Sequence, residues 1–377
     1  MTSEKRVMAP GVFVQEVAGG VRMIEGAATS TPAFLGSLPG GPEDPVLVRD
    51  RAAFDAAFPE KGPSTTRDCV NGHFANGGGP CYVVNVAPPD ADADNLDLQS
   101  ALAALESHSD VHVIAVPDLW SVPEAAPDIA QQVADHCVAM GNRVALLHTP
   151  EGLSVGEAAA VPERLGLGDR AREFTAVYYP WVRVPGPGDT PTCAPPVGHV
   201  AGAWARTDAG RGVHKAPANE SLVGTLGLER ELSEKELTTL TEASVNVLRA
   251  FPQRTPTVWG ASTLSRDPHM RHLNVRRYVN FLRDSIVQST GWAVFEPNNE
   301  QLWDAMRTAV EGFLTEQWQA GALHGRTAEE AFYVTCDRTN NSTDRGDVIA
   351  SIGVAPMRPA EFVRFDVSQA AGQAEEL

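Results

Sequence analysis

The sequence predicts an α/β protein of two domains with an extended strand at each end of the chain. Three observations support this fold class. The 377 residues, 43% of them hydrophobic, are enough for two domains with real cores. Uniformly apolar strand-like runs alternate with helical patterns, and an isolated strand-forming run lies near each terminus.

Residues 1–20 are expected to form an N-terminal arm. Its strand-forming residues are Val12, Phe13, Val14, Gln15 and Val17, between Pro10-Gly11 and Gly19-Gly20. No second strand lies close enough in sequence to form a hairpin, and a lone strand is not stable in water. The arm therefore pairs either with a distant strand of its own domain or with a sheet edge of another subunit.

Residues 21–197 are interpreted as the first α/β domain. Strands are expected at 33–36, 45–48, 81–86, 111–116 and 143–147, helices at 51–58, 66–76, 96–106 and 129–140, and a closing strand-like run at 174–184. Because these strands are apolar without alternation and are separated by helices, the sheet should be mostly parallel and covered on both faces.

This domain also contains the best argument for an enzyme. Asp118 and His148 follow predicted strands, and open α/β sheets bind ligands at the carboxyl ends of their strands. The alternative is that Asp118 caps a turn and His148 is an ordinary strand-end residue. Cys69, His73 and Cys81 have no spacing typical of a zinc site, so buried thiols are the favoured interpretation.

Residues 198–232 are interpreted as a segment that connects the two domains. Gly210 and Gly212, with His214 and Lys215, resemble an anion-binding loop, but neither phosphate-binding fingerprint is present. The favoured interpretation is a tight turn in which glycine adopts positive φ.

Residues 233–355 are interpreted as the second α/β domain. Capping boxes are expected at Ser233 and Thr327, strands at 257–260, 292–295 and 332–336, and helices at 275–286 and 302–313. Three arginines lie off the apolar stripe of the first of these helices, Arg276, Arg277 and Arg283. They form either a solvated face or a basic face that meets an acidic partner. His269 and His272 are interpreted as a surface turn.

Residues 356–377 are interpreted as a second linking strand followed by a polar tail. The strand-forming residues are Phe362, Val363, Arg364, Phe365 and Val367, whose alternation fits a half-buried strand. The tail from residue 368 is small, polar and acidic, and is expected to be disordered.

Composition excludes several classes of function. The net charge of −18 argues against binding to nucleic acid and to anionic membrane surfaces. No apolar run is long enough to span a bilayer, and five widely spaced cysteines suit a reducing compartment. We therefore expect synthesis and folding in the cytoplasm, with no cofactor.

Several multi-residue motifs carry a resemblance to a known family. They are PGVFVQEV at 10–17, YYPWVRVPGP at 178–187, GHVAG at 198–202, RGVHKAPAN at 211–219, VWGASTLS at 258–265, FEPNNE at 295–300 and EEAFYVTCDRT at 329–339. Together they are similar to the motifs of contractile tail sheath proteins, found in myophage tails and in phage-like contractile injection systems. The segment at 340–348 departs from the family pattern, because Gly346-Asp347-Val348 stands where Gly-Arg-Leu is common.

The resemblance implies a structural protein and not an enzyme. It implies a helical homopolymer whose terminal strands pair with neighbouring subunits, which surrounds an inner tube and contracts to drive that tube through a target cell envelope. The implied partners are the inner tube protein and the baseplate and tail-terminator or cap proteins. The second domain would face the tube, where Arg276, Arg277 and Arg283 are candidate contacts. A phage tail and a headless injection system remain equally compatible, and the rival is a cytoplasmic α/β nucleotide- or cofactor-binding enzyme.

Overall fold

The structure is a computed structural model that describes residues 22–60, 62–86, 98–186, 190–252, 254–344 and 346–361. Both predicted linking strands, at 12–17 and 362–367, lie outside the described residues.

A nine-stranded sheet forms the body of the protein, in the order β2-β3-β1-β4-β5-β6-β11-β12-β9. Its strands are β1 (Pro32–Gly36), β2 (Val46–Val48), β3 (Cys81–Asn85), β4 (Val113–Ala115), β5 (Val144–His148), β6 (Thr175–Tyr179), β9 (Glu220–Ser221), β11 (Val245–Phe251) and β12 (Arg254–Val258). The run from β3 to β11 is parallel, while the edge pairs β2–β3, β11–β12 and β12–β9 are antiparallel. The predicted parallel sheet is therefore confirmed.

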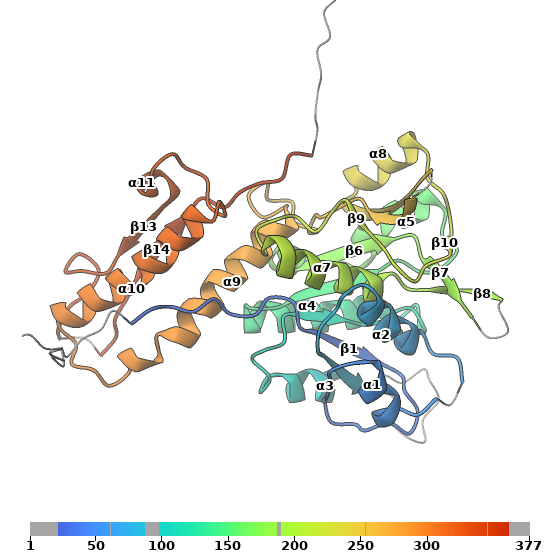
Figure 1. Cartoon of the computed structure of the whole chain (residues 1–377), viewed down its shortest axis with the longest axis horizontal. Helices are drawn as coiled ribbons and strands as arrows, with labels where there is room; N and C mark the ends of the chain where they lie inside the picture. Colours follow the sequence, from blue (N-terminus) through green and yellow to red (C-terminus); the bar gives the residue numbers. More distant parts are fainter. Residues whose placement is uncertain are drawn as a thin grey trace, which may run out of the picture.

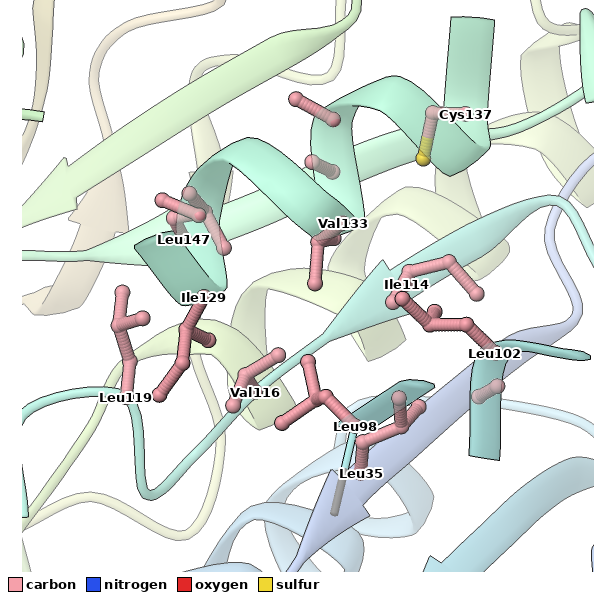
Figure 2. Packing of buried hydrophobic residues seen from close by; sticks show 14 of the residues in the cluster. Leu35, Leu98, Leu102, Ile114, Val116, Leu119, Ile129, Val133, Cys137 and Leu147 are labelled. Atoms are coloured by element: carbon pink, nitrogen blue, oxygen red, sulfur yellow. The ribbon is translucent and has the colours of Figure 1, made fainter. Parts of the chain in front are cut away.

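Helices cover both faces of this sheet. One face carries α3 (Leu98–Leu105), α4 (Ala126–Met140), α5 (Val155–Arg164) and α6 (Asp169–Glu173), and the other carries α1 (Arg51–Ala57), α2 (Thr65–Ala75) and α7 (Val197–Arg211). Figure 2 shows Leu98 of α3 beside Leu35 of β1, and Leu102 of α3 beside Ile114 of β4. Every residue of β1 and β4 is buried because each strand faces helices on both sides.

A second, smaller sheet extends the body beyond β6. It contains β7 (Val182–Pro185), β8 (Pro191–Ala194) and β10 (Gly227–Leu228) in the order β10-β7-β8. The run predicted as one strand at 174–184 is therefore split between two sheets, with β6 in the large sheet and β7 in the small one.

The predicted domain division does not follow the sheet. β11 lies after the connecting segment 198–232, yet Val245 pairs with Val177 of β6, so the large sheet runs on through both predicted domains. Local sequence patterns predict a strand but not which sheet it joins. α8 (Glu234–Glu242) packs on β11 and begins with the predicted capping box at Ser233.

The separate unit begins at α9 and has its own core. It contains α9 (Leu273–Ser289), the 3₁₀ turn η2 (Gly291–Ala293), α10 (Glu300–Gln319), α11 (Ala328–Ala331) and the antiparallel pair β13 (Phe332–Thr335) and β14 (Ser351–Val354). Figure 1 shows this helical unit beside the sheet body, with α9 lying between α10 and the body. Tyr278 and Leu282 of α9 pack with Phe313 and Leu314 of α10.

Two predictions in this unit are wrong. The strand expected at 292–295 is the turn η2 followed by Phe295, whose φ is 69°. The expected capping box at Thr327 is absent, because its side chain makes no cap hydrogen bond.

The connecting segment 198–232 contains most of a helix that the sequence did not predict. Residues expected to form only a connection build α7, and the predicted positive φ is found at Gly212, where the helix ends. The helix was missed for two reasons. Glycine is unfavourable in a helix interior, and α7 shows no amphipathic stripe because it is buried on nearly all sides.

The glycines of α7 allow a very close approach to α2. A Cβ placed on Gly198 would lie 2.0 Å from the carbonyl oxygen of Cys69, and one on Gly202 would lie 2.4 Å from that of His73. A side chain at either position would therefore collide with the backbone of α2.

Gly198→Ala should destabilise the fold by about 1–3 kcal/mol, because the added methyl forces the two helix backbones apart. Gly210→Ala is the matched control on the same helix, since a Cβ there meets nothing within 4 Å. It should stabilise α7 by roughly 0.5–1 kcal/mol. Urea unfolding of both variants checks this, and equal effects would contradict the close packing.

The contact between α2 and α7 should also be sensitive to acid. Burial lowers the pKa of His73 and of His199 to about 4. Because these pKa values lie below that of an exposed histidine, about 6.5, the unfolded chain binds more protons in this range. Stability is thus complete above about pH 6.5 and falls as the pH approaches 4.

His199→Leu removes one of the two groups and should make the unfolding free energy less dependent on pH between 7 and 4. The slope of the unfolding free energy against pH should decrease by up to about 1.4 kcal/mol per pH unit. Urea titrations at several pH values measure it, with the slope and not the absolute stability as the readout. An unchanged slope would show that His199 is not buried in its neutral form.

Candidate assembly interface

The strand ends that suggested a ligand site are occupied by internal hydrogen bonds. The Asp118 carboxylate accepts from the backbone N–H of Ser37 at 2.7 Å, from the Thr66 hydroxyl at 2.8 Å and from the Thr65 hydroxyl. His148 is fully buried, and its ring nitrogens lie 3.1 Å from the Pro117 carbonyl oxygen and 2.9 Å from that of Thr149. These contacts fit the structural interpretation of both residues.

The candidate metal ligands also have structural surroundings. Cys69 and Cys81 are buried, and burial raises the pKa of both thiols. No group of three His, Cys, Asp or Glu side chains in the described part of the chain is arranged to hold a metal ion. His269 and His272 instead contact the C-terminal segment, as described below.

The first described residues run along α9 in the opposite direction to the helix. The backbone N–H groups of Glu25 and Ala27 donate to the hydroxyls of Ser289 and Ser285, at 3.1 and 2.9 Å. The Arg22 guanidinium lies 4.3 Å from the centre of the Trp292 ring, just beyond the C-terminal end of α9. The segment that leads back to the N-terminal arm is therefore fixed at that end of the helix (Figure 1).

The last described residues lie at the other end of α9. The Asn274 side-chain amide donates to the Met357 carbonyl oxygen at 3.0 Å, and an Arg358 nitrogen lies 3.0 Å from the ring of His269. His272 faces Glu361 at 3.4 Å. Because α9 has 17 residues, the first and last described segments are held about 25 Å apart by one helix.

Buried ion pairs attach α9 to the sheet body. The two terminal guanidinium nitrogens of Arg277 donate to the Asp208 carboxylate of α7, at 2.5 and 3.1 Å. Arg276 faces Glu173 of α6 at 3.5 Å and stacks 4.4 Å from the centre of the Phe174 ring. Burial lowers the pKa of Arg276 to about 10.

The predicted solvated arginine face is therefore wrong for two of its three members. Arg276 and Arg277 are each only 4% exposed, because they point at carboxylates of the sheet body and not at solvent. Arg283 is exposed, as expected, and donates to the Met140 carbonyl oxygen at 2.6 Å. No local pattern signalled the burial, since Asp208 and Glu173 lie far away in sequence.

The strand pair β13–β14 presents open sheet edges. Within the described residues, the two strands pair only with each other. They are partly exposed, and the Tyr333 side chain is 63% exposed. Unpaired N–H and C=O groups on such edges are a template for a strand from another chain.

Among the helices that the structure describes, none is long and apolar enough to cross a bilayer.

Comparison with known families gives two adjoining matches. Residues 91–264 match the family described as the phage tail sheath protein central domain, and residues 265–370 match the phage tail sheath C-terminal domain. The boundary between the two matches falls after β12, the last strand of the large sheet along the chain, and before α9.

Solved structures agree over almost the whole chain. The anti-feeding prophage helical sheath in its contracted state is 29% identical, with a TM-score of 0.79 over 97% of this chain and 100% of that one. The PVC sheath of an extracellular contractile injection system in its contracted state is 26% identical, with a TM-score of 0.80 over 97% and 99% of the two chains.

A curated relative matches over a shorter region. The tail sheath protein of Vibrio phage KVP40 is 26% identical over 179 residues, which are 46% of this chain and 26% of the relative. The chain therefore spans about a quarter of the length of this curated relative.

Removing one partner of the Arg277–Asp208 pair should strongly lower the free energy of unfolding. Arg277→Met leaves a buried carboxylate without its counterion, with an expected loss of about 3–5 kcal/mol. Arg283→Met on the same helix is the control and should change stability by less than about 0.5 kcal/mol, because its side chain is exposed. Urea unfolding measures both, and similar small losses would refute the structural role of the pair.

Proposed function

This chain belongs to the phage tail sheath protein family, and we propose that it is a sheath subunit that polymerises helically around an inner tube and contracts to drive the tube through a target cell envelope. The observation that carries the proposal is the placement of the first and last described segments at opposite ends of α9, next to a strand pair with open edges.

Contacts of this kind build open assemblies. A subunit that offers strands at two different places, and accepts strands at a third, makes contacts between unlike surfaces. Such contacts propagate into a helix unless a ring closes them. We propose that the strands at 12–17 and 362–367 add to the β13–β14 pairs of neighbouring copies, where main-chain hydrogen bonds supply the affinity.

Contraction requires subunits that stay linked while their bodies move. In the proposed mechanism, the shared strands persist in the extended and the contracted state. The free-energy difference between these states lies in the contacts between subunit bodies, which differ from one state to the other. The net charge of −18 on each copy makes such contacts dependent on salt.

The proposed partners are further copies of the chain, the inner tube protein, and baseplate and terminator or cap proteins. A matched relative from the anti-feeding prophage baseplate supports the baseplate contact. The particle is a phage tail or a tail-like injection device, assembled inside the cell that makes it. Of the three candidate arginines, only Arg283 is exposed enough to meet a tube, so charge reversal there is the informative test of that contact.

The enzyme alternative has no support in the arrangement of the candidate residues. Asp118 and His148 bond to neighbouring groups of the fold, and the matched relatives are sheath proteins. Negative-stain electron microscopy of the protein co-expressed with its tube partner tests the proposal. Long hollow cylinders are expected, whereas uniform monomers or small closed oligomers would refute it.

Deleting residues 1–18 should give a folded protein that no longer forms cylinders, because the deletion removes the linking strand and leaves the described body intact. Deleting residues 1–9 is the matched control, since it spares that strand, and cylinders should persist. Circular dichroism confirms folding and electron microscopy scores assembly. Normal cylinders from the longer deletion would show that the arm does not link subunits.

A further inference from the structure

The loop between α9 and α10 ends in an apolar tip, defined here as Val294 and Phe295. Val294 is 63% exposed and Phe295 is completely exposed. Phe295 also has a φ of 69°, a left-handed conformation that bulky residues rarely adopt. Strained backbone of this kind clusters at functional and ligand-holding sites.

The tip projects from an anchored loop. Trp292 packs in a cluster with Leu302 and Trp303, and lies under the Arg22 guanidinium. On the other side, the Trp303 indole donates to the Asn298 side-chain oxygen at 2.8 Å, and the Asn298 amide donates to the Ser342 carbonyl oxygen at 3.1 Å. The tip is thus presented in a fixed place.

An apolar groove of about 750 Å³ lies at the other end of α9. Its apolar lining consists of Met270, Val275, Val279, Val354, Ala355, Pro356 and Met357. Its charged or titratable lining consists of His269, His324 and Arg358, and no carboxylate belongs to the lining among the described residues. The groove is therefore mostly apolar, and the polar groups that line it are one arginine and two histidines.

The tip of a subunit cannot reach the groove of the same subunit. Val275 and Val279 lie in the first half of α9, while the tip follows the last turn of this helix. The two regions thus lie at opposite ends of α9, whose 17 residues give it a length of about 25 Å. A second copy is needed to bring the two together.

We propose that the Val294–Phe295 tip of one copy inserts into the groove of the next copy. Charge as well as shape favours this occupant. Glu296 directly follows the tip, its side chain is 45% exposed, and its ion pair with Arg22 is long, at 4.0 Å. Insertion of Phe295 carries this carboxylate to the basic side chains of the groove, a complementary arrangement.

The contact rests on the proposed sheath function and adds a second kind of link to it. Tip and groove are different surfaces of one chain, so the contact is heterologous and propagates. It involves side chains, whereas the terminal strands link subunits through backbone hydrogen bonds.

Disulfide trapping tests the contact directly. Phe295→Cys and Met357→Cys are combined in a Cys193→Ser background, because Cys193 is the native cysteine that is not buried. Particles assembled with the tube protein are oxidised and run on a denaturing gel. A ladder of covalent sheath multimers is expected from the double variant, and monomers from each single variant. Leu226→Cys with Met357→Cys is the control, since Leu226 is 59% exposed on the sheet body, and should give no ladder.

Other outcomes overturn the proposal in distinguishable ways. Cylinders that give no ladder would exclude the contact, and a link from Phe295→Cys to the tube protein would assign the tip to the tube. Failure of the unmodified protein to form cylinders would overturn the sheath function and this contact with it. As a second measurement, Phe295→Ser should at least halve the yield of cylinders at an unchanged melting temperature, and an unchanged yield would count against the tip.

Discussion

The attachment of α9 to the sheet body is the interaction on which the rest of the structure depends. One face of this helix packs against α10 through Tyr278 and Leu282, and the other points Arg276 and Arg277 at carboxylates of the body. Apolar packing alone tolerates small shifts between helices. A buried guanidinium that contacts both oxygens of a carboxylate does not, because any shift leaves desolvated charge unpaired.

That fixed attachment determines where the chain enters and leaves the subunit. The segment from residue 22 is bonded to the C-terminal half of α9, and the segment that ends at residue 361 is bonded near its N-terminus. A rotation of the sheet body therefore moves the roots of both proposed arms together. In a contracting assembly, this rigidity would transmit movement of the bodies to the linking strands, with little lost in bending inside the subunit.

Much of the fold can be predicted from local sequence, and the predictions that failed did so for identifiable reasons. The parallel strands were predictable because strands buried on both faces are apolar throughout, and α9 because its apolar stripe has helical spacing. α7 was not predictable, because its glycines allow a close approach to α2 that the sequence alone does not reveal. The large sheet crosses the predicted domain boundary, because the pairing of β11 with β6 joins residues about 70 positions apart. The exposure of Phe295 was missed because valine and phenylalanine together also suit a strand, whereas the loop's anchors at Trp303 and Ser342 are distant in sequence.

The two proposed kinds of contact suit different parts of a contraction cycle. Backbone pairing in a shared sheet depends little on which side chains are present, so a shared strand can keep its hydrogen bonds while the bodies reorient. An apolar tip in a groove depends on one relative position of two bodies. Burying a single phenylalanine contributes roughly 1.5–3 kcal/mol, so each such contact is weak enough to break, yet many copies together hold a lattice in one state. A sheath that must remain extended and then release needs both properties, and α9 carries the tip at one end and the groove at the other.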